Sequence, residues 1–283
     1  MLFRSAIYAA PDGRLHEIVP GSIEDAIEGR VIFIGDADQR LREDYLRILR
    51  FFRFNAWYGA GLDGEGLAAC ERQKDGLAKI AAERIWKELK RLMEAPDPSG
   101  ALMAMEDTGV MAAVLPGASA SELPSLVAVE QGAGLAPDPL RRLMAMVPRR
   151  PRDVQHMTAH LRLSNAEAGR LAQWAAPALP HVLGLPEKAL RGLFYRHGAE
   201  AVLDRALIEA AQGPGADAFE AVLRAAEDWQ RPSFPIGGED ALAAGLKGPG
   251  IGDRLRALEE DWIASDFTLG RGELLARLSS RTE

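Results

Sequence analysis

Between residues 38 and 54 the chain carries acidic and basic side chains at the spacing of one helical face. Taken at 100° per residue, five of them share an arc of about 120°: Arg40, Glu43, Asp44, Arg47 and Arg50. The opposite arc is apolar and consists of Leu41, Tyr45, Ile48, Leu49 and Phe52. A carboxylate held beside a guanidinium places one hydrogen-bond acceptor next to one donor. Such a pair can recognise the edge of a nucleobase.

The order of acceptor and donor determines which bases fit. Cytosine and adenine each present an exocyclic amino donor beside a ring-nitrogen acceptor, so Asp44 can accept from the amino group while Arg47 donates to the ring nitrogen. Uracil and guanine present the reverse pattern and would leave both side chains mispaired, which is strongly unfavourable for buried groups. The alternative is a solvated face of intrahelical salt bridges, each contributing about 0.2–0.5 kcal/mol.

The run from Val31 to Gly59 resembles the neck of class II tRNA nucleotidyltransferases, the family of CCA-adding enzymes and bacterial poly(A) polymerases. The matching residues are Ile34-Gly35-Asp36, Arg40, Glu43 to Arg50, and Arg53-Phe54. The resemblance implies that Asp44 and Arg47 read the bases of incoming CTP and ATP. The supporting residues that it implies are Arg40, Glu43 and Arg50.

A second run, Ala82 to Glu88, resembles the motif that follows in the same family, a Glu-Arg-x-x-x-Glu element. The resemblance implies that Glu83, Arg84 and Glu88 brace the neck, with Glu83 and Arg84 orienting the base-reading helix. From the residues alone, this run is equally an ordinary amphipathic helix with an i,i+4 pair between Arg84 and Glu88.

Arginines gather in two clusters, which matters because phosphate binding needs positive potential only at the contact surface. The net charge of −7 argues against wholesale wrapping of nucleic acid. The clusters are Arg40, Arg42, Arg47, Arg50 and Arg53, and then Arg141, Arg142, Arg149, Arg150 and Arg152. The RNA contacts predicted from them are Arg53, Arg141, Arg142, Arg149 and Arg150. The alternative is a solvated helix face, in particular for the second cluster.

Weaker resemblances to the body and tail of the family lie further along the chain. In the body-like run 161–167, Ser164 is predicted to cap a helix with Glu167 three residues on. In the tail-like run 234–240, a glycine turn opening a helix could offer backbone N–H groups to an RNA phosphate. A tight turn between two helices explains the same glycines.

Carboxylates for metal-dependent transfer are missing from the sequence. The family resemblance implies an Asp-x-Asp and an Arg-Arg-Asp element holding Mg²⁺ in a preceding head domain, and neither element is found. Residues 1–10 resemble the segment after the second element, with Ser5 in place of Asn. Asp36 and Asp38 are interpreted as helix-capping or turn residues. The prediction is therefore no catalytic residue and no bound metal in this chain, with Mg²⁺ needed by the complete enzyme.

Two histidines, His156 and His160, share a helical face at i,i+4. No nearby acid or cysteine completes a zinc site, so a structural role is predicted. The single cysteine, Cys70, cannot form an internal disulfide, which fits a reducing compartment. With no apolar run long enough to span a membrane and no signal peptide, a cytoplasmic protein is expected.

Composition favours a helical architecture: 47% of the 283 residues are hydrophobic and only 6% are aromatic. Segments 6–9 and 15–19 flank Pro11-Asp12-Gly13 and predict a hairpin, and a short strand is expected over 31–34. The expected fold is mainly α, with helical neck, body and tail domains and a short amino-terminal β-hairpin remnant. The predicted divisions are 1–35 (head remnant), 36–116 (neck), 117–230 (body) and 231–283 (tail).

The resemblance implies a protein that adds nucleotides from CTP and ATP to tRNA 3′ ends, with tRNA as its partner and neither DNA nor a membrane. The expected contribution of this chain is base selection and RNA binding. Three alternatives stay open: a catalytically inactive RNA-binding module, a poly(A) polymerase fragment, and a helical protein-interaction scaffold.

Overall fold

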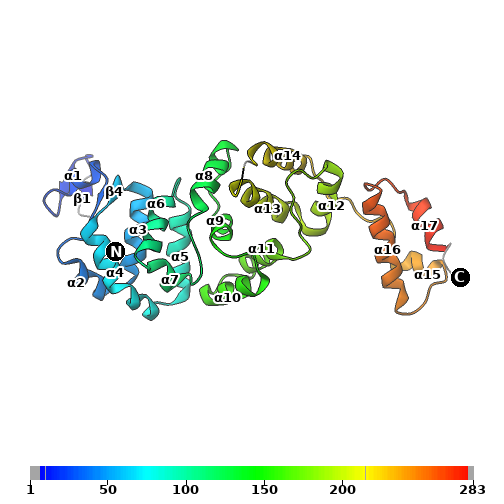
Figure 1. The fold of residues 1–283 in the computed structure, drawn as a ribbon, viewed down its shortest axis with the longest axis horizontal. Coiled ribbons are helices and arrows are strands. Elements are labelled where there is room, and N and C mark those ends of the chain that lie inside the picture. The colour runs from blue at the N-terminus through cyan, green and yellow to red at the C-terminus, as the bar shows by residue number, and fades with distance from the viewer. Residues whose placement is uncertain (1–6, 10, 214, 280–283) are drawn as a thin grey trace. The chain divides into compact units, whose positions relative to one another are not determined.

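The computed structural model describes residues 7–9, 11–213 and 215–279 (Figure 1). Contacts divide the chain into two compact units, which are described separately: residues 1–178 with 207–216, and residues 179–206 with 217–283. Among the described residues, α-helices α1 to α17 dominate and four short strands are present. The predicted mainly α fold is confirmed, and the predicted boundaries at residues 36, 117 and 231 stay predictions.

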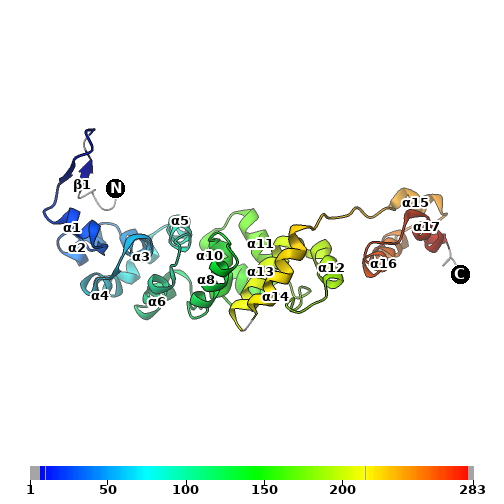
Figure 2. The same cartoon turned by 90° about the horizontal axis from the view of Figure 1, so that it is seen from above.

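The first unit begins with the expected hairpin. Strand β1 (Ile7–Ala9) pairs antiparallel with β2 (Leu15–Glu17), with Ile7 opposite Glu17. In the turn, Asp12 accepts a hydrogen bond from the Arg14 backbone N–H at 3.0 Å. Figure 2 shows the hairpin projecting from the helices that follow it. Ala6, predicted as part of the first strand, lies outside the described residues.

A second strand pair joins the segments before α2 and after α3. After α1 (Ser22–Ile27), β3 (Arg30–Val31) pairs parallel with β4 (Gly61–Leu62), so the strand predicted over 31–34 is shorter than expected. Gly29 permits this approach because its φ is +66° and a Cβ there would lie 2.8 Å from the Ala60 nitrogen. The ends of the 31–61 segment are thereby held together.

The helix predicted over 38–55 is two helices, and this part of the prediction is wrong. Helix α2 (Ala37–Glu43) ends at Asp44, whose φ of −156° and ψ of 103° are extended, and α3 (Leu46–Tyr58) follows. The apolar side was nevertheless predicted correctly, because four of its five residues are fully buried: Leu41, Ile48, Leu49 and Phe52. The break therefore moves the polar residues away from their predicted arrangement, whereas the apolar residues are buried as predicted.

Short helices pack around α3 to complete the neck region. They are α4 (Gly64–Gln73), the 3-10 helix η1 (Lys74–Lys79), α5 (Ala82–Met93), α6 (Ser99–Asp107) and α7 (Val110–Val114). Helix α3 lies beside α5 (Figure 1). Because α5 carries the second predicted motif, this packing brings the two motifs together.

Four further helices follow in the first unit. They are α8 (Leu123–Gly132), α9 (Pro139–Met146), α10 (Pro151–Leu161) and α11 (Asn165–Ala175). Two of them, α9 and α11, have side-chain caps. Asp138 caps α9 by accepting from two backbone N–H groups, at 2.9 and 3.1 Å. Ser164 and Glu167 form the predicted capping box at α11, with the Ser164 N–H donating to Glu167 at 2.9 Å.

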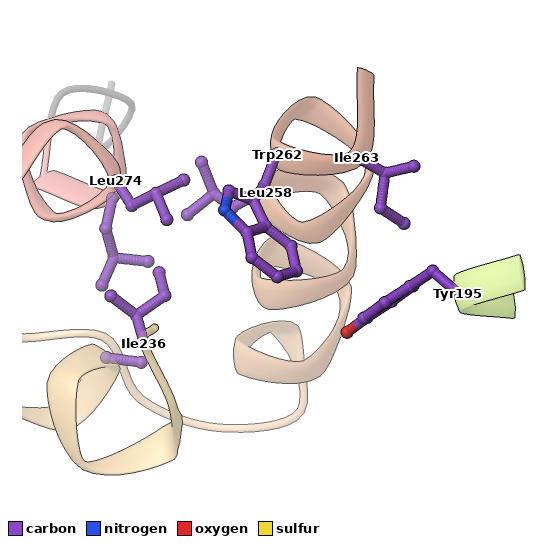
Figure 3. Packing of buried hydrophobic residues seen from close by; sticks show 8 residues of the cluster. Tyr195, Ile236, Leu258, Trp262, Ile263 and Leu274 are labelled. Atoms are coloured by element: carbon purple, nitrogen blue, oxygen red, sulfur yellow. The ribbon is translucent and has the colours of Figure 1, made fainter. Parts of the chain in front are cut away.

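The second unit has its own aromatic core. Its helices are α12 (Glu187–His197), part of α13 (Ala199–Ala211), α14 (Ala216–Glu227), α15 (Gly238–Ala243), α16 (Gly250–Ala264) and α17 (Arg271–Ser279). Tyr195 meets Trp262 edge to face, with ring centroids 5.6 Å apart, and Leu258, Ile236 and Leu274 complete the cluster (Figure 3). Buried aromatic pairs of this kind stabilise by about 0.5–1.5 kcal/mol beyond their burial.

The glycine turn at α15 is internally satisfied. The Gly237 N–H donates to Asp240 Oδ2 at 2.9 Å, and Arg271 also binds Asp240. This favours the tight-turn interpretation of the glycines over a phosphate site. In the part of the chain that the structure describes, no helix is both long and apolar enough to cross a membrane.

Candidate functional site

The break between α2 and α3 places Asp44 at a helix end. Its carboxylate Oδ1 accepts a hydrogen bond from the Leu46 N–H at 3.1 Å, and its backbone carbonyl accepts from the Arg47 N–H at 3.0 Å. Asp44 thus holds the first residue of α3 through a side-chain hydrogen bond. The five polar residues do not form one helical stripe, because Arg40 and Glu43 belong to α2 while Arg47 and Arg50 belong to α3.

Arg47 is held by the last turn of α2. Its Nη1 donates to Glu43 Oε2 and to the Arg40 carbonyl, and its side chain is only 13% exposed. Arg40 also donates to Glu43, at 2.9 Å. The hydrogen bond from Arg47, opposed by desolvation, lowers the pKa of Glu43. Glu43 therefore stays ionised and fixes the direction of Arg47.

Asp44 and Arg47 each keep one group available for a ligand. Among the described residues Asp44 Oδ2 accepts no hydrogen bond, and it forms only a 3.5 Å ion pair with Arg84. The Arg47 Nη2 donates to no described residue, and its Nε is buried and likewise without an acceptor there. The break therefore carries one acceptor and unused donors on residues three apart.

Tyr45 anchors the break against η1. A Cβ on Gly76 would lie 2.1 Å from the Tyr45 ring, so only glycine admits the ring at this position. The Lys79 ammonium lies 5.4 Å from the centroid of the same ring. The helical pattern places Tyr45 on the apolar face but gives no indication of Gly76, because a glycine that accommodates a distant ring has no local sequence signal.

Glu88 of α5 binds two arginines of α3 at once. Its carboxylate oxygens accept from Arg50 Nε at 2.8 Å and from Arg53 Nε at 2.9 Å. The Glu88 side chain is 6% exposed and the arginines are 14% and 16% exposed. The expected i,i+4 pair between Arg84 and Glu88 is replaced by these contacts. Arg53, predicted to contact RNA, is instead committed to Glu88 and to the Phe54 ring, 4.3 Å away.

Replacing Glu88 with glutamine is expected to destabilise the chain by about 3 kcal/mol, because two largely buried guanidinium groups lose their shared counter-charge. Urea unfolding of the wild type and Glu88→Gln measures the change. Glu94→Gln, at an exposed position one residue past α5, is the control and should shift stability by less than about 0.5 kcal/mol. Equal stability of Glu88→Gln and the control would contradict this account of the contact.

The remaining bracing residues connect α5 to α10 and α11. Glu83 accepts from Arg162 Nη1 at 2.7 Å, so its partner is on the segment after α10 and not on the neck helices. Glu167 accepts from Lys90 at 2.8 Å and from the Trp86 ring nitrogen at 3.2 Å. Arg84 faces Asp44. The bracing roles stay proposals, with Glu83 turned away from the break.

Acid should selectively weaken the Glu167 contacts. Burial raises the pKa of Glu167, but hydrogen bonds from Lys90, Ser164 and Trp86 outweigh it and lower the pKa to about 2. A carboxyl group whose pKa is lower in the folded than in the unfolded state stabilises the fold at pH values above its unfolded pKa. This stabilisation is lost as the pH falls through the folded pKa. We expect the stability difference between the wild type and Glu167→Gln to be full at pH 6 and to shrink from about pH 5 towards pH 2. Urea titrations across this range test it, and a difference independent of pH would contradict it.

Arg142, predicted to contact RNA, is buried inside the first unit. Its side chain is 1% exposed and donates to Glu130 at 2.9 Å and to the carbonyls of Met93 and Ala95, each at 2.5 Å. It therefore ties the end of α5 to α8 and α9. The burial of Arg142 could not be read from the sequence, because the neighbouring Arg141 is the same residue type and only one of the two is fully buried.

The other arginines of the second cluster differ in availability. Arg141 is 14% exposed and lies 3.9 Å from Glu130, and Arg149 donates to the carbonyls of Trp174 and Ala176 at 2.8 and 2.9 Å. Arg150 keeps a guanidinium that is 73% exposed. Of the five predicted RNA contacts, Arg150 is the one whose side chain is mainly in solvent.

A metal site is not formed by the described residues, which contain no group of three or more His, Cys, Asp or Glu side chains able to hold an ion. Asp36 caps α2 by accepting from the Gln39 N–H at 2.6 Å, which confirms its predicted role. Hydrogen bonds from Arg72 and Gln73 lower the pKa of Asp38 to about 2. Both aspartates are thus engaged structurally, and the residues present do not fit a Mg²⁺ pair.

Comparison with known proteins identifies related chains. Residues 62–121 match the family model described as "Probable RNA and SrmB- binding site of polymerase A". The chain is 28% identical to the mitochondrial CCA tRNA nucleotidyltransferase 1 of Mus musculus over 284 residues, covering 96% of this chain and 63% of that protein. It is 38% identical over 112 residues to the CCA-adding enzyme of Geobacillus kaustophilus, covering 39% of this chain and 28% of that enzyme.

Solved structures share the fold. The Bacillus stearothermophilus CCA-adding enzyme in complex with CTP superposes with a TM-score of 0.76 at 22% identity, covering 97% of this chain and 71% of that one. The Thermotoga maritima CCA-adding enzyme complexed with tRNA gives a TM-score of 0.62 at 17% identity, covering 96% of this chain and 69% of that one. The chain spans about 63% of the length of the mouse relative. Over most of its length the chain is similar to CCA-adding enzymes, and residues 62–121 match a family model of polymerase A.

Proposed function

We propose that this chain selects the incoming nucleotide and binds tRNA in the addition of C and A nucleotides to tRNA 3′ ends. The observation that carries the proposal is the break at Asp44, where a free carboxylate oxygen and an oriented guanidinium lie three residues apart. Related proteins are named as CCA tRNA nucleotidyltransferases, and related structures contain CTP, ATP or tRNA. These names support the proposed substrates.

Base selection follows from which atoms are still available. Asp44 Oδ2 accepts from the amino group of cytosine or adenine, and Arg47 donates to the adjoining ring nitrogen. Glu43 keeps Arg47 in place, and Arg84 balances the charge on Asp44 from 3.5 Å. In uracil and guanine a carbonyl oxygen would face the Asp44 carboxylate and a ring N–H would face the Arg47 guanidinium, so neither pair could form a hydrogen bond. Because both groups are fixed before the nucleotide arrives, little ordering opposes the correct base.

Nucleotide transfer needs groups that this chain does not supply. We propose that the 283 residues alone do not catalyse transfer, since the described residues hold no cluster suited to Mg²⁺ and the carboxylate motifs are missing from the sequence. The complete enzyme would use Mg²⁺ held by other residues. We also propose a cytoplasmic location, in keeping with a single cysteine, Cys70, which cannot form an internal disulfide.

Two measurements on the purified chain test this function. The chain should bind a tRNA transcript with an affinity that falls as salt increases, because phosphate contacts release counterions. It should not incorporate labelled CTP into that transcript. Robust incorporation would overturn the proposal that these 283 residues alone do not catalyse nucleotide transfer. Absence of tRNA binding at low salt would instead favour a protein-interaction scaffold.

A further inference from the structure

A cavity of about 520 Å³ lies in the first unit, away from the neck break. Three segments line it: residues 115–117 after α7, residues 147–148 after α9, and one side of α10 together with Arg150, which precedes that helix. Its volume is within the range of small-ligand pockets, about 300–1,000 Å³. None of the residues assigned above to base reading lines it.

One side of the lining is polar and belongs to α10. His156 and His160 are four residues apart on one helical face, and both are exposed. Arg150 Nε forms an ion pair with Asp153 Oδ2 across 2.7 Å. Its two terminal nitrogens have no partner in the described ranges 11–213 and 215–279. The ion pair thus fixes the guanidinium while leaving the ends that suit a phosphate.

The other part of the lining is apolar. Leu115 is 2% exposed, and Val147 and Met157 are half-buried against the same space. A ligand that satisfies both parts needs a flat apolar face together with an anionic group. Unstacked nucleotides have this chemistry, and bases stack on imidazole rings and guanidinium planes while phosphates accept their hydrogen bonds.

The match to the family model bears on whether RNA or a protein occupies the cavity. Residues 115–117 fall inside the matched region, 62–121, whose description names RNA and the protein SrmB. Single-stranded RNA accounts for the imidazoles and the guanidinium, which a purely apolar protein contact would not use. RNA is therefore the better-supported occupant, and a protein partner is an outcome of the test.

We propose that this cavity is an RNA subsite that takes one unpaired nucleotide, its base against Leu115 and Met157 and its phosphate on Arg150 and His156. The proposal rests on the RNA binding proposed above and assigns it a place. It also gives His156 and His160 a role beyond the structural one predicted from sequence.

The test compares two double variants of α10 in the full chain. Arg150→Ala/His156→Ala removes the proposed contacts, whereas Arg152→Ala/Gln155→Ala is a matched control at exposed positions of the same helix that do not line the cavity. Fluorescence anisotropy with a single-stranded RNA of about ten nucleotides measures affinity. The cavity variant should bind about tenfold or more weakly, and the control within about twofold, with both unfolding like the wild type.

A second probe separates base insertion from general charge. RNA carrying 4-thiouridine should crosslink to residues 151–161 in the wild type and lose that crosslink in the cavity variant. Equal weakening by both double variants, or unchanged affinity of the cavity variant, would overturn the proposal. Unchanged RNA affinity with lost binding of purified SrmB would assign the cavity to a protein instead. If the wild-type chain shows this crosslink but does not prefer CTP over UTP, the proposed base-reading function is refuted and the RNA subsite is not.

Discussion

Asparagine in place of Asp44 is expected to remove the preference of the chain for CTP and ATP over UTP and GTP. The variant keeps an oxygen to accept from the Leu46 N–H, so this hydrogen bond at the start of α3 persists, but an amino donor replaces Oδ2. A hydrogen bond to a charged group is worth about 1.5–3 kcal/mol, which corresponds to about 10–100-fold in relative affinity. Competition binding with the four triphosphates measures this ratio.

Asp107→Asn, at an exposed acid at the end of α6, controls for the loss of one negative charge. It should leave the ratio unchanged within about twofold. A general loss of repulsion would tighten binding of all four nucleotides in both variants. An unchanged CTP-to-UTP ratio in Asp44→Asn, with the fold intact, would remove Asp44 from base selection.

Replacing Arg142 with methionine is expected to destabilise the chain by about 3–5 kcal/mol, because Glu130 is then left buried without its partner. Burial, partly offset by Arg142, already raises the pKa of Glu130. Without Arg142 that pKa rises further, and a raised carboxyl pKa weakens stability as pH increases. The deficit of Arg142→Met should therefore be larger at pH 7 than at pH 5, as measured by urea unfolding.

The double variant Arg142→Met/Glu130→Leu distinguishes charge from packing. It should regain most of the lost stability, because no unpaired buried charge remains. Arg152→Ala, on the surface of α10, should change stability by less than about 0.5 kcal/mol. If the double variant is as unstable as Arg142→Met alone, the carbonyl contacts of Arg142 and not its charge pair carry the stability.

Sequence periodicity predicted the buried side of the neck correctly and misjudged its polar side. Helical spacing places the apolar residues on one side, so Leu41, Ile48 and Phe52 were assigned to the core from their positions. The break depends on local backbone geometry at Asp44 and on Tyr45 packing against Gly76, which lies about 30 residues later. Such a contact leaves no trace in a helical wheel.

Charge clusters were the least predictive feature. Arg142 and Arg150 look equivalent in the sequence, yet one is enclosed by backbone carbonyls and the other is exposed. Depth is decided by which helices pack over a residue, and here α5, α8 and α9 meet at Arg142. Capping signals such as Ser164 with Glu167 were predictable because both partners lie within one turn.

We propose that Asp44 and Arg47 read the base of the incoming nucleotide. The most direct measurement is the affinity of the wild-type chain for each of the four triphosphates, obtained by competition against one labelled nucleotide. CTP and ATP should displace the label at concentrations at least about tenfold lower than UTP and GTP. Equal displacement by all four would contradict it.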